Sequence, residues 1–142
     1  MKLKKNIPLI DQHDKHGFWG GKFGGSYIPE TLRKPIDDLT IKFEKLRKDK
    51  KFLAERDYYY NNWVHKGPTP FIKLENLTNY LGGAQIYAKV VSAARGGAHK
   101  IYGAITAAML CKRMGKRHLV TDTGAGYNGK MFSIAAKYFG LK

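Results

Sequence analysis

Lys100 is the residue of this sequence whose type and surroundings best suit covalent chemistry. It follows a glycine turn at Gly96 and Gly97 and stands at the start of a largely apolar helical stretch. The positive end of a helix and partial burial both favour a neutral lysine amine, and the neutral amine attacks aldehydes to form a Schiff base. Lys100 is therefore a candidate Schiff-base residue. In a chain with 26 lysines and arginines, an ordinary surface lysine is the alternative.

A second glycine-rich turn is a candidate anion site. It consists of Thr123, Gly124, Ala125, Gly126, Tyr127, Asn128 and Gly129. An apolar helical stretch at 131–139 follows it, and the N-terminus of a helix offers free N–H groups and partial positive charge to carboxylates and phosphates. The glycines would let such a ligand approach the backbone closely. A turn with no ligand is the alternative.

The elements that must position these two turns alternate in type. The β-branched stretch at 85–91 predicts a strand, the lysine turn leads into a helix stopped by Gly115, and 118–121 predicts a second strand before the second turn. This order predicts an α/β fold with a parallel sheet and flanking helices. Ligands bind such sheets at the carboxyl ends of the strands, where both glycine turns would lie.

The chain divides into three predicted segments. Residues 1–30 alternate glycines with aromatic side chains and predict an irregular segment, residues 31–83 are helical, and residues 84–142 form the α/β segment that carries Lys100. Within the helical segment, a buried face is predicted from the spacing of Leu32, Ile36, Leu39, Phe43 and Leu46, with Pro35 in the first turn. A second helix is predicted from Phe52 towards Tyr60, and a loop is predicted at 65–71. A short helix is then predicted over 74–81, ended by Gly82 and Gly83.

Composition limits the class of protein. With 43% hydrophobic and 13% aromatic residues, the chain is typical of a globular protein. The only cysteine, Cys111, falls in an apolar helical pattern, so we expect a buried thiol and no internal disulfide. No stretch approaches the roughly 20 apolar residues of a membrane helix. We expect a soluble, cytoplasmic protein without a membrane partner.

The charge is strongly basic, because 26 basic residues minus 11 acidic ones give +15. A nucleic-acid-binding module is one interpretation, and it would show an affinity that falls steeply with salt. The basic residues are scattered along the chain rather than clustered, so we expect a solvated surface and no nucleic-acid partner.

A metal site is a further possibility near the start of the chain, at Asp11, His13, Asp14 and His16. Their spacing fits no standard zinc pattern, and we predict no metal.

Several pieces of sequence occur in an order that matches a known family. They are Phe23-Gly24-Gly25-Ser26-Tyr27-Ile28-Pro29-Glu30, Gly67-Pro68-Thr69-Pro70, Gly96-Gly97-Ala98-His99-Lys100, Lys112-Arg113-Met114-Gly115-Lys116 and Thr123-Gly124-Ala125-Gly126. Together they resemble the β subunit of tryptophan synthase over residues 17–142. The resemblance implies the fold-type II architecture of pyridoxal-phosphate enzymes and a reaction that makes tryptophan from serine and indole.

The resemblance also implies roles for individual residues. Lys100 would hold pyridoxal 5'-phosphate and move protons at the substrate's α carbon, and His99 would lie near the cofactor's phosphate. The backbone from Thr123 to Asn128 would hold the serine carboxylate, and Asp122 would be the acid–base residue. An α subunit that delivers indole and a β–β dimer are the implied partners of the intact protein.

The sequence departs from the family pattern in several places. Lys89-Val90-Val91-Ser92 stands where the family usually has lysine, arginine, glutamate and aspartate, Tyr127-Asn128 replaces a glutamine–histidine pair, and Lys130 adds bulk beyond it. Asp122 is one methylene shorter than the family's glutamate, and a misplacement near 1 Å can cost about a hundredfold in rate.

The resemblance covers about the opening third of the family's subunit, so we expect either a fragment or a decayed gene product, with little synthase activity alone. The nearest alternative is another fold-type II enzyme, related to threonine synthase or serine dehydratase. Gly97-Ala98-His99-Lys100 argues against it, because those relatives more often have serine and phenylalanine before the lysine.

Overall fold

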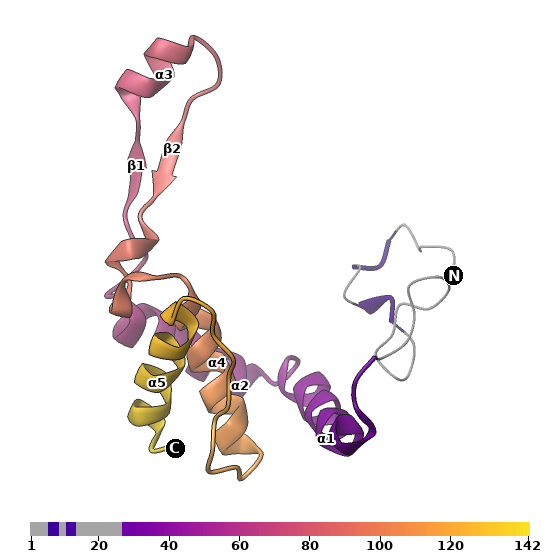
Figure 1. Cartoon of the computed structure of the whole chain (residues 1–142). Helices are drawn as coiled ribbons and strands as arrows, with labels where there is room; N and C mark the ends of the chain where they lie inside the picture. The colour runs from indigo at the N-terminus through magenta and orange to yellow at the C-terminus, as the bar shows by residue number, and fades with distance from the viewer. Residues whose placement is uncertain (1–5, 9–10, 14–26) are drawn as a thin grey trace. The chain divides into compact units, whose positions relative to one another are not determined.

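The structure, a computed structural model, describes residues 6–8, 11–13 and 27–142. It forms two compact units, Met1–Glu44 and Lys45–Lys142 (Figure 1). Most of the predicted irregular segment at 1–30, including the motif residues 23–26, lies outside the described residues. No helix of the described part is long and apolar enough to cross a membrane.

Helix α1, Glu30–Leu46, confirms the helix predicted from the apolar spacing. Two details differ from the prediction. Pro35 lies inside the helix rather than in its first turn, where it removes one backbone hydrogen bond. The apolar face is also largely exposed, because among its members only Leu46 is buried, while Leu32, Ile36, Leu39 and Phe43 are 37–48% exposed.

Helix α2, Lys50–Tyr59, is the second predicted helix and begins at a capped N-terminus. The Asp49 carboxylate accepts hydrogen bonds from the backbone N–H groups of Lys51 and Phe52, at 2.8 and 3.3 Å. The helix continues into one π-helical turn, η3, Tyr60–Val64. The hydroxyl of Tyr60 then bonds to the hydroxyl of Thr106 at 2.6 Å, which fastens this turn to the helix that follows Lys100.

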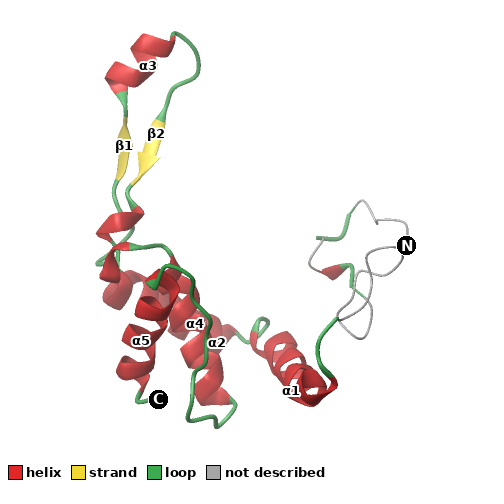
Figure 2. Ribbon diagram, viewed as in Figure 1, coloured by secondary structure: helices red, strands yellow, loops and turns green. Residues whose placement is uncertain are grey.

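A hairpin arm follows, and Figure 2 shows its two strands joined through a short helix. Strand β1, Phe71–Lys73, pairs antiparallel with β2, Tyr87–Lys89, and α3, Glu75–Leu81, connects them. The rings of Phe71 and Tyr87 stack with their centroids 5.0 Å apart. Helix α3 ends at Gly82, whose φ of 62° is left-handed, as predicted for its terminating glycine.

The predicted parallel sheet is not found in the described residues. The sheet there has two strands, β1 and β2, and they run antiparallel. Of the strand predicted over 85–91, the structure has only β2, Tyr87–Lys89. The strand predicted over 118–121 is not formed. A strand needs a neighbour to satisfy its backbone groups. The backbone at 117–119 is hydrogen-bonded to the backbone of Lys142. The N–H of Lys142 donates to the Arg117 carbonyl, and the N–H of Leu119 donates to the Lys142 carbonyl, both at 2.8 Å. These two bonds alternate as in a parallel pair.

The core lies between α4, Lys100–Arg113, and α5, Tyr127–Phe139. The predicted stripe on α4 is confirmed, because Ile101, Ala104, Ile105, Ala108 and Cys111 are all buried. Met131, Ala135 and Ala136 of α5 are buried as well. The alanines on both helices let the two backbones approach closely. Gly115 (φ 68°) and Gly140 (φ 66°) follow the two helices as predicted, although α5 begins four residues before the predicted start at Met131.

We predict opposite effects for two substitutions on α4. Ile105 is fully buried, so Ile105→Ala should lower the free energy of unfolding by about 2–5 kcal/mol through lost burial and a cavity. Gly103 is exposed, and a Cβ placed on it meets nothing within 4 Å, so Gly103→Ala should stabilise by about 0.5–1 kcal/mol. Urea unfolding followed by circular dichroism measures both values. Equal effects of the two substitutions would contradict the assignment of the core.

We also predict a pH effect from Cys111. Burial raises the pKa of its thiol above the ordinary value of 9.0, and the thiol donates a hydrogen bond to the His118 carbonyl at 3.4 Å. The unfolded chain therefore loses the thiol proton first, so stability is fully present below pH 9 and declines as the pH rises above it. From about pH 7.5 to 9.5, the wild-type chain should lose more stability than Cys111→Ala. Identical losses in urea unfolding would refute this.

Candidate active site

Lys100 is the first residue of α4, and His99 occupies the N-cap position before it. Both side chains are exposed. The partial burial that was expected for Lys100 is therefore not found among the described residues, because the apolar stripe of α4 begins only with Ile101 and faces α5. The amine is thus presented to solvent at the positive end of the helix.

The first glycine turn is shaped by its backbone and held by α5. Gly96 and Gly97 both have a φ of 81°, a left-handed conformation that favours glycine. The N–H of Gly97 donates to the Ala94 carbonyl at 2.8 Å. A Cβ added to Gly96 would lie 2.5 Å from Met131 Cε and 3.3 Å from Ile134 Cδ1. Gly96 therefore lies against side chains of α5, and a side chain at this position would require the end of the buried Met131 side chain to move.

Arg95 also anchors this turn, a role that sequence reasoning missed. Its Nε donates to the Trp63 carbonyl at 2.8 Å, and its guanidinium lies 4.4 Å from the centroid of the Trp63 ring. The Trp63 ring in turn contacts the Tyr138 ring, 4.5 Å between centroids. An arginine directly before a glycine pair was the available signal, but its partner lies 32 residues earlier in the chain.

The second turn leads into the N-terminus of α5. Gly126, with a φ of 81°, is the N-cap, and no side chain caps the helix within the described chain. The amide nitrogen of the Asn128 side chain donates to Thr121 Oγ1 at 2.8 Å and to the Asp122 carbonyl at 3.2 Å. This side chain stabilises the turn from within, so the backbone N–H groups at the start of α5 remain available to an anion.

Tyr127 brings the two turns together. Its hydroxyl donates to the carbonyl oxygens of Gly97, at 3.2 Å, and Gly96, at 3.4 Å. The structure therefore places the turn before Lys100 beside the turn at 123–128, as a shared site requires. The exposed Asp122 carboxylate makes no ion pair in the described residues.

Residues 89–92, which differ from the family pattern, contact the base of the hairpin arm. Lys89 Nζ donates to the carbonyl of the buried Thr69 at 2.5 Å, so its amine holds the base of the hairpin arm. The neighbouring Val90 and Val91 are partly buried. The stretch therefore supports the hairpin with one lysine and two apolar side chains.

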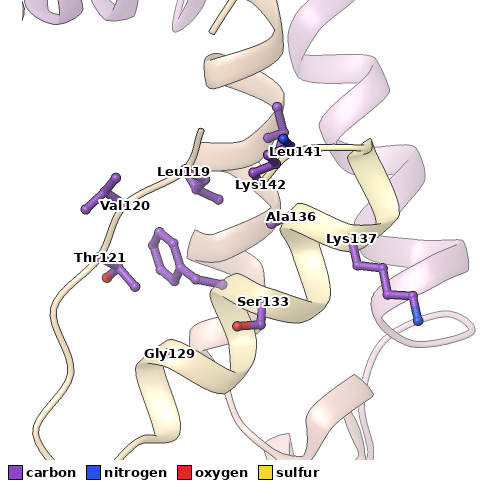
Figure 3. A pocket seen from close by; sticks show the side chains of 10 residues that line it. Leu119, Val120, Thr121, Gly129, Ser133, Ala136, Lys137, Leu141 and Lys142 are labelled. Atoms are coloured by element: carbon purple, nitrogen blue, oxygen red, sulfur yellow. The ribbon is translucent and has the colours of Figure 1, made fainter. Parts of the chain in front are cut away.

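An open groove of about 700 Å³ flanks the second turn without coinciding with the site (Figure 3). It lies between the extended stretch at 119–121 and the face of α5 that carries Phe132 and Ser133. Its lining includes Gly129, the last residue of the predicted anion turn, but not Lys100, His99 or Asp122. The lining residues are Leu119, Val120, Thr121, Gly129, Phe132, Ser133, Ala136, Lys137, Leu141 and Lys142. The predicted site at the two turns and this groove are therefore largely separate features of the described residues.

Metal-binding side chains do not gather in the described part of the chain. No group of three or more histidine, cysteine, aspartate or glutamate side chains there could hold an ion. Of the four acidic and histidine residues near the start, Asp14 and His16 lie outside the described residues, and His13 Nε2 is 3.7 Å from Glu44.

We predict a graded response to alanine at three glycines. Gly96→Ala combines a left-handed backbone with a clash against Met131 and should cost about 2–5 kcal/mol of stability. Gly126→Ala has the same φ but open space and should cost about 1–2 kcal/mol. Gly83→Ala has neither problem and should stay within about 0.5 kcal/mol. Chemical denaturation gives all three values, and a Gly96→Ala chain as stable as the wild type would contradict the packing described here.

The comparisons with known proteins agree with the motifs. No protein-family model matches the chain. The tryptophan synthase beta chain of Fusobacterium nucleatum subsp. nucleatum is 42% identical over 129 residues, which cover 91% of this chain and 32% of that relative. The chain therefore spans about a third of the length of the curated relative it matches.

Identity at this level over nine-tenths of the chain indicates common ancestry with this relative over the matched residues. The resemblance to tryptophan synthase beta chains that was inferred from the motifs is confirmed.

Proposed function

We propose that Lys100 binds pyridoxal 5'-phosphate covalently, as the cofactor lysine of a tryptophan synthase β chain. The observation that carries this proposal is the Tyr127 bridge, which joins the turn before Lys100 to the uncapped start of α5. This contact supports a shared site, in which the amine of Lys100 and the start of α5 would act on the same ligand. An aldehyde that carries a phosphate, together with an amino-acid substrate that carries a carboxylate, suits this combination.

The residues present fit these ligands. Lys100 is exposed at the first position of α4, so an aldehyde has access to its amine. His99, exposed at the N-cap, would lie near the cofactor's phosphate. Thr123 and its neighbours up to Asn128 would hold the substrate carboxylate through backbone N–H groups, since the start of α5 has no side-chain cap in the described chain.

The bound cofactor supplies an electron sink for the carbanion at the substrate's α carbon. Lys100 would remove and return the proton at that carbon. Asp122 would act as the acid that assists departure of the serine hydroxyl and as the base at the indole nitrogen. Its carboxylate is exposed and unpaired in the described residues, so it is available for this role.

The proposed reaction is β-replacement, in which L-serine and indole give L-tryptophan. We propose it for a protein of the matched relative's length, of which this chain spans 32%. In that protein the elements described here would belong to a fold-type II α/β architecture. An α subunit that delivers indole and a second β chain are the proposed partners.

Cofactor trapping tests the proposal. The purified chain is mixed with pyridoxal 5'-phosphate and reduced with borohydride, and the modified lysines are mapped by peptide mass spectrometry. We expect label concentrated on Lys100, together with a visible absorption band that Lys100→Ala abolishes. Lys112→Ala is the matched control, because Lys112 is an exposed lysine on the same helix.

The Lys112→Ala chain should keep both the band and the label on Lys100. Label spread evenly over many lysines, at the same level in Lys100→Ala, would overturn the assignment.

A further inference from the structure

Tyr127 is the residue of the second turn whose side chain contacts the turn before Lys100. It is the first residue of α5, and its hydroxyl reaches two carbonyl oxygens that lie 30 and 31 residues earlier, on Gly97 and Gly96. Helix packing fixes the start of α5, because Met131 is fully buried four residues further on. The phenol therefore extends from a rigid base to the backbone just before His99 and Lys100.

The fit between the phenol and the first turn is close. A Cβ added to Gly97 would lie 3.2 Å from the Tyr127 hydroxyl oxygen, a separation at which one of the two groups must move. The Lys130 ammonium lies 5.6 Å from the centroid of the Tyr127 ring, so its charge faces the ring from the following turn of α5. The hydroxyl is thus directed at the glycine carbonyls, and these carbonyls orient the peptide planes that lead to Lys100.

We propose that Tyr127 is a positioning residue for Lys100. By holding the Gly96 and Gly97 carbonyls, its hydroxyl fixes the direction in which the chain enters α4, and so sets where the amine of Lys100 is presented. This role belongs to the side chain of Tyr127 and is distinct from the backbone role proposed for residues 123–128 in carboxylate binding. The effect on cofactor binding rests on the proposed function of Lys100. The contact between Tyr127 and the glycine turn can be tested without cofactor.

The first measurement is amide hydrogen exchange of the cofactor-free chain, followed by mass spectrometry of peptides that cover 94–101. Tyr127→Phe removes only the hydroxyl. Loss of one hydrogen bond should speed exchange in these peptides by about threefold to tenfold, while the midpoint of thermal unfolding falls by less than about 10 °C. Tyr80→Phe is the matched control, because Tyr80 is 86% exposed on α3, and it should leave exchange at 94–101 unchanged.

The second measurement is the rate at which Lys100 is labelled by pyridoxal 5'-phosphate and borohydride, divided by the rate at which Lys112 is labelled, from pH 6.5 to 9. We expect Tyr127→Phe to lower this ratio by about threefold to tenfold across the range, and Tyr80→Phe to preserve it. Global loosening of the fold would raise labelling at both lysines and would not lower the ratio.

The possible failures are distinguishable. A wild-type chain without selective label on Lys100, but with faster exchange at 94–101 in Tyr127→Phe, would overturn the cofactor assignment and keep the contact. Exchange at 94–101 that is the same in Tyr127→Phe and Tyr80→Phe would overturn the positioning role. So would an unchanged Lys100 to Lys112 ratio in a wild-type chain that does label Lys100 selectively.

Discussion

The packing of α4 against α5 is the interaction on which the described fold and site depend. Alanines at 104 and 108 on one helix and at 135 and 136 on the other are buried, and their small side chains allow two helices to approach closely. That closeness places Gly96 against Met131 and brings Tyr127 within hydrogen-bond distance of the Gly97 carbonyl. The two glycine turns are therefore neighbours because the helices that follow them pack together. Substitutions that separate the helices would also separate the turns.

Local patterns predicted the helices well. The stripe from Ile101 to Cys111 is buried as its spacing required, and the glycines at 82, 115 and 140 end their helices with left-handed backbones. These features depend on residues close in sequence, such as the spacing of apolar side chains and the conformational freedom of glycine. For the same reason, the start of α5 was placed too late. Residues 127–130 carry no aliphatic side chain and so do not extend the apolar pattern. They are helical because the helix begins directly after its N-cap, Gly126.

The sheet could not be predicted in the same way. A β-branched stretch indicates that a strand is favoured, but the direction of pairing depends on which partner is present. The residues around β2 pair with Phe71–Lys73, a stretch that adjoins the predicted loop, and the resulting pair is antiparallel. For the site, the sequence and its motifs predict Lys100 and the second turn. The contacts of Arg95 with Trp63 and of Tyr127 with Gly97 join residues about thirty positions apart, and no local pattern reveals them.

The fit of Gly96 against α5 has a consequence for how this sequence can change during evolution. A methyl group at residue 96 would need the space that Met131 Cε and Sδ now fill, and its backbone would still be left-handed. A shorter side chain at 131 would relieve the clash but open a cavity in the core while residue 96 stays glycine. Neither a side chain at residue 96 nor a shorter side chain at residue 131 is neutral by itself. Shortening residue 131 removes the clash with a methyl group at 96 but not the cost of its left-handed backbone. The two positions are therefore epistatic, and drift at one of them is restrained for as long as the other keeps its present residue.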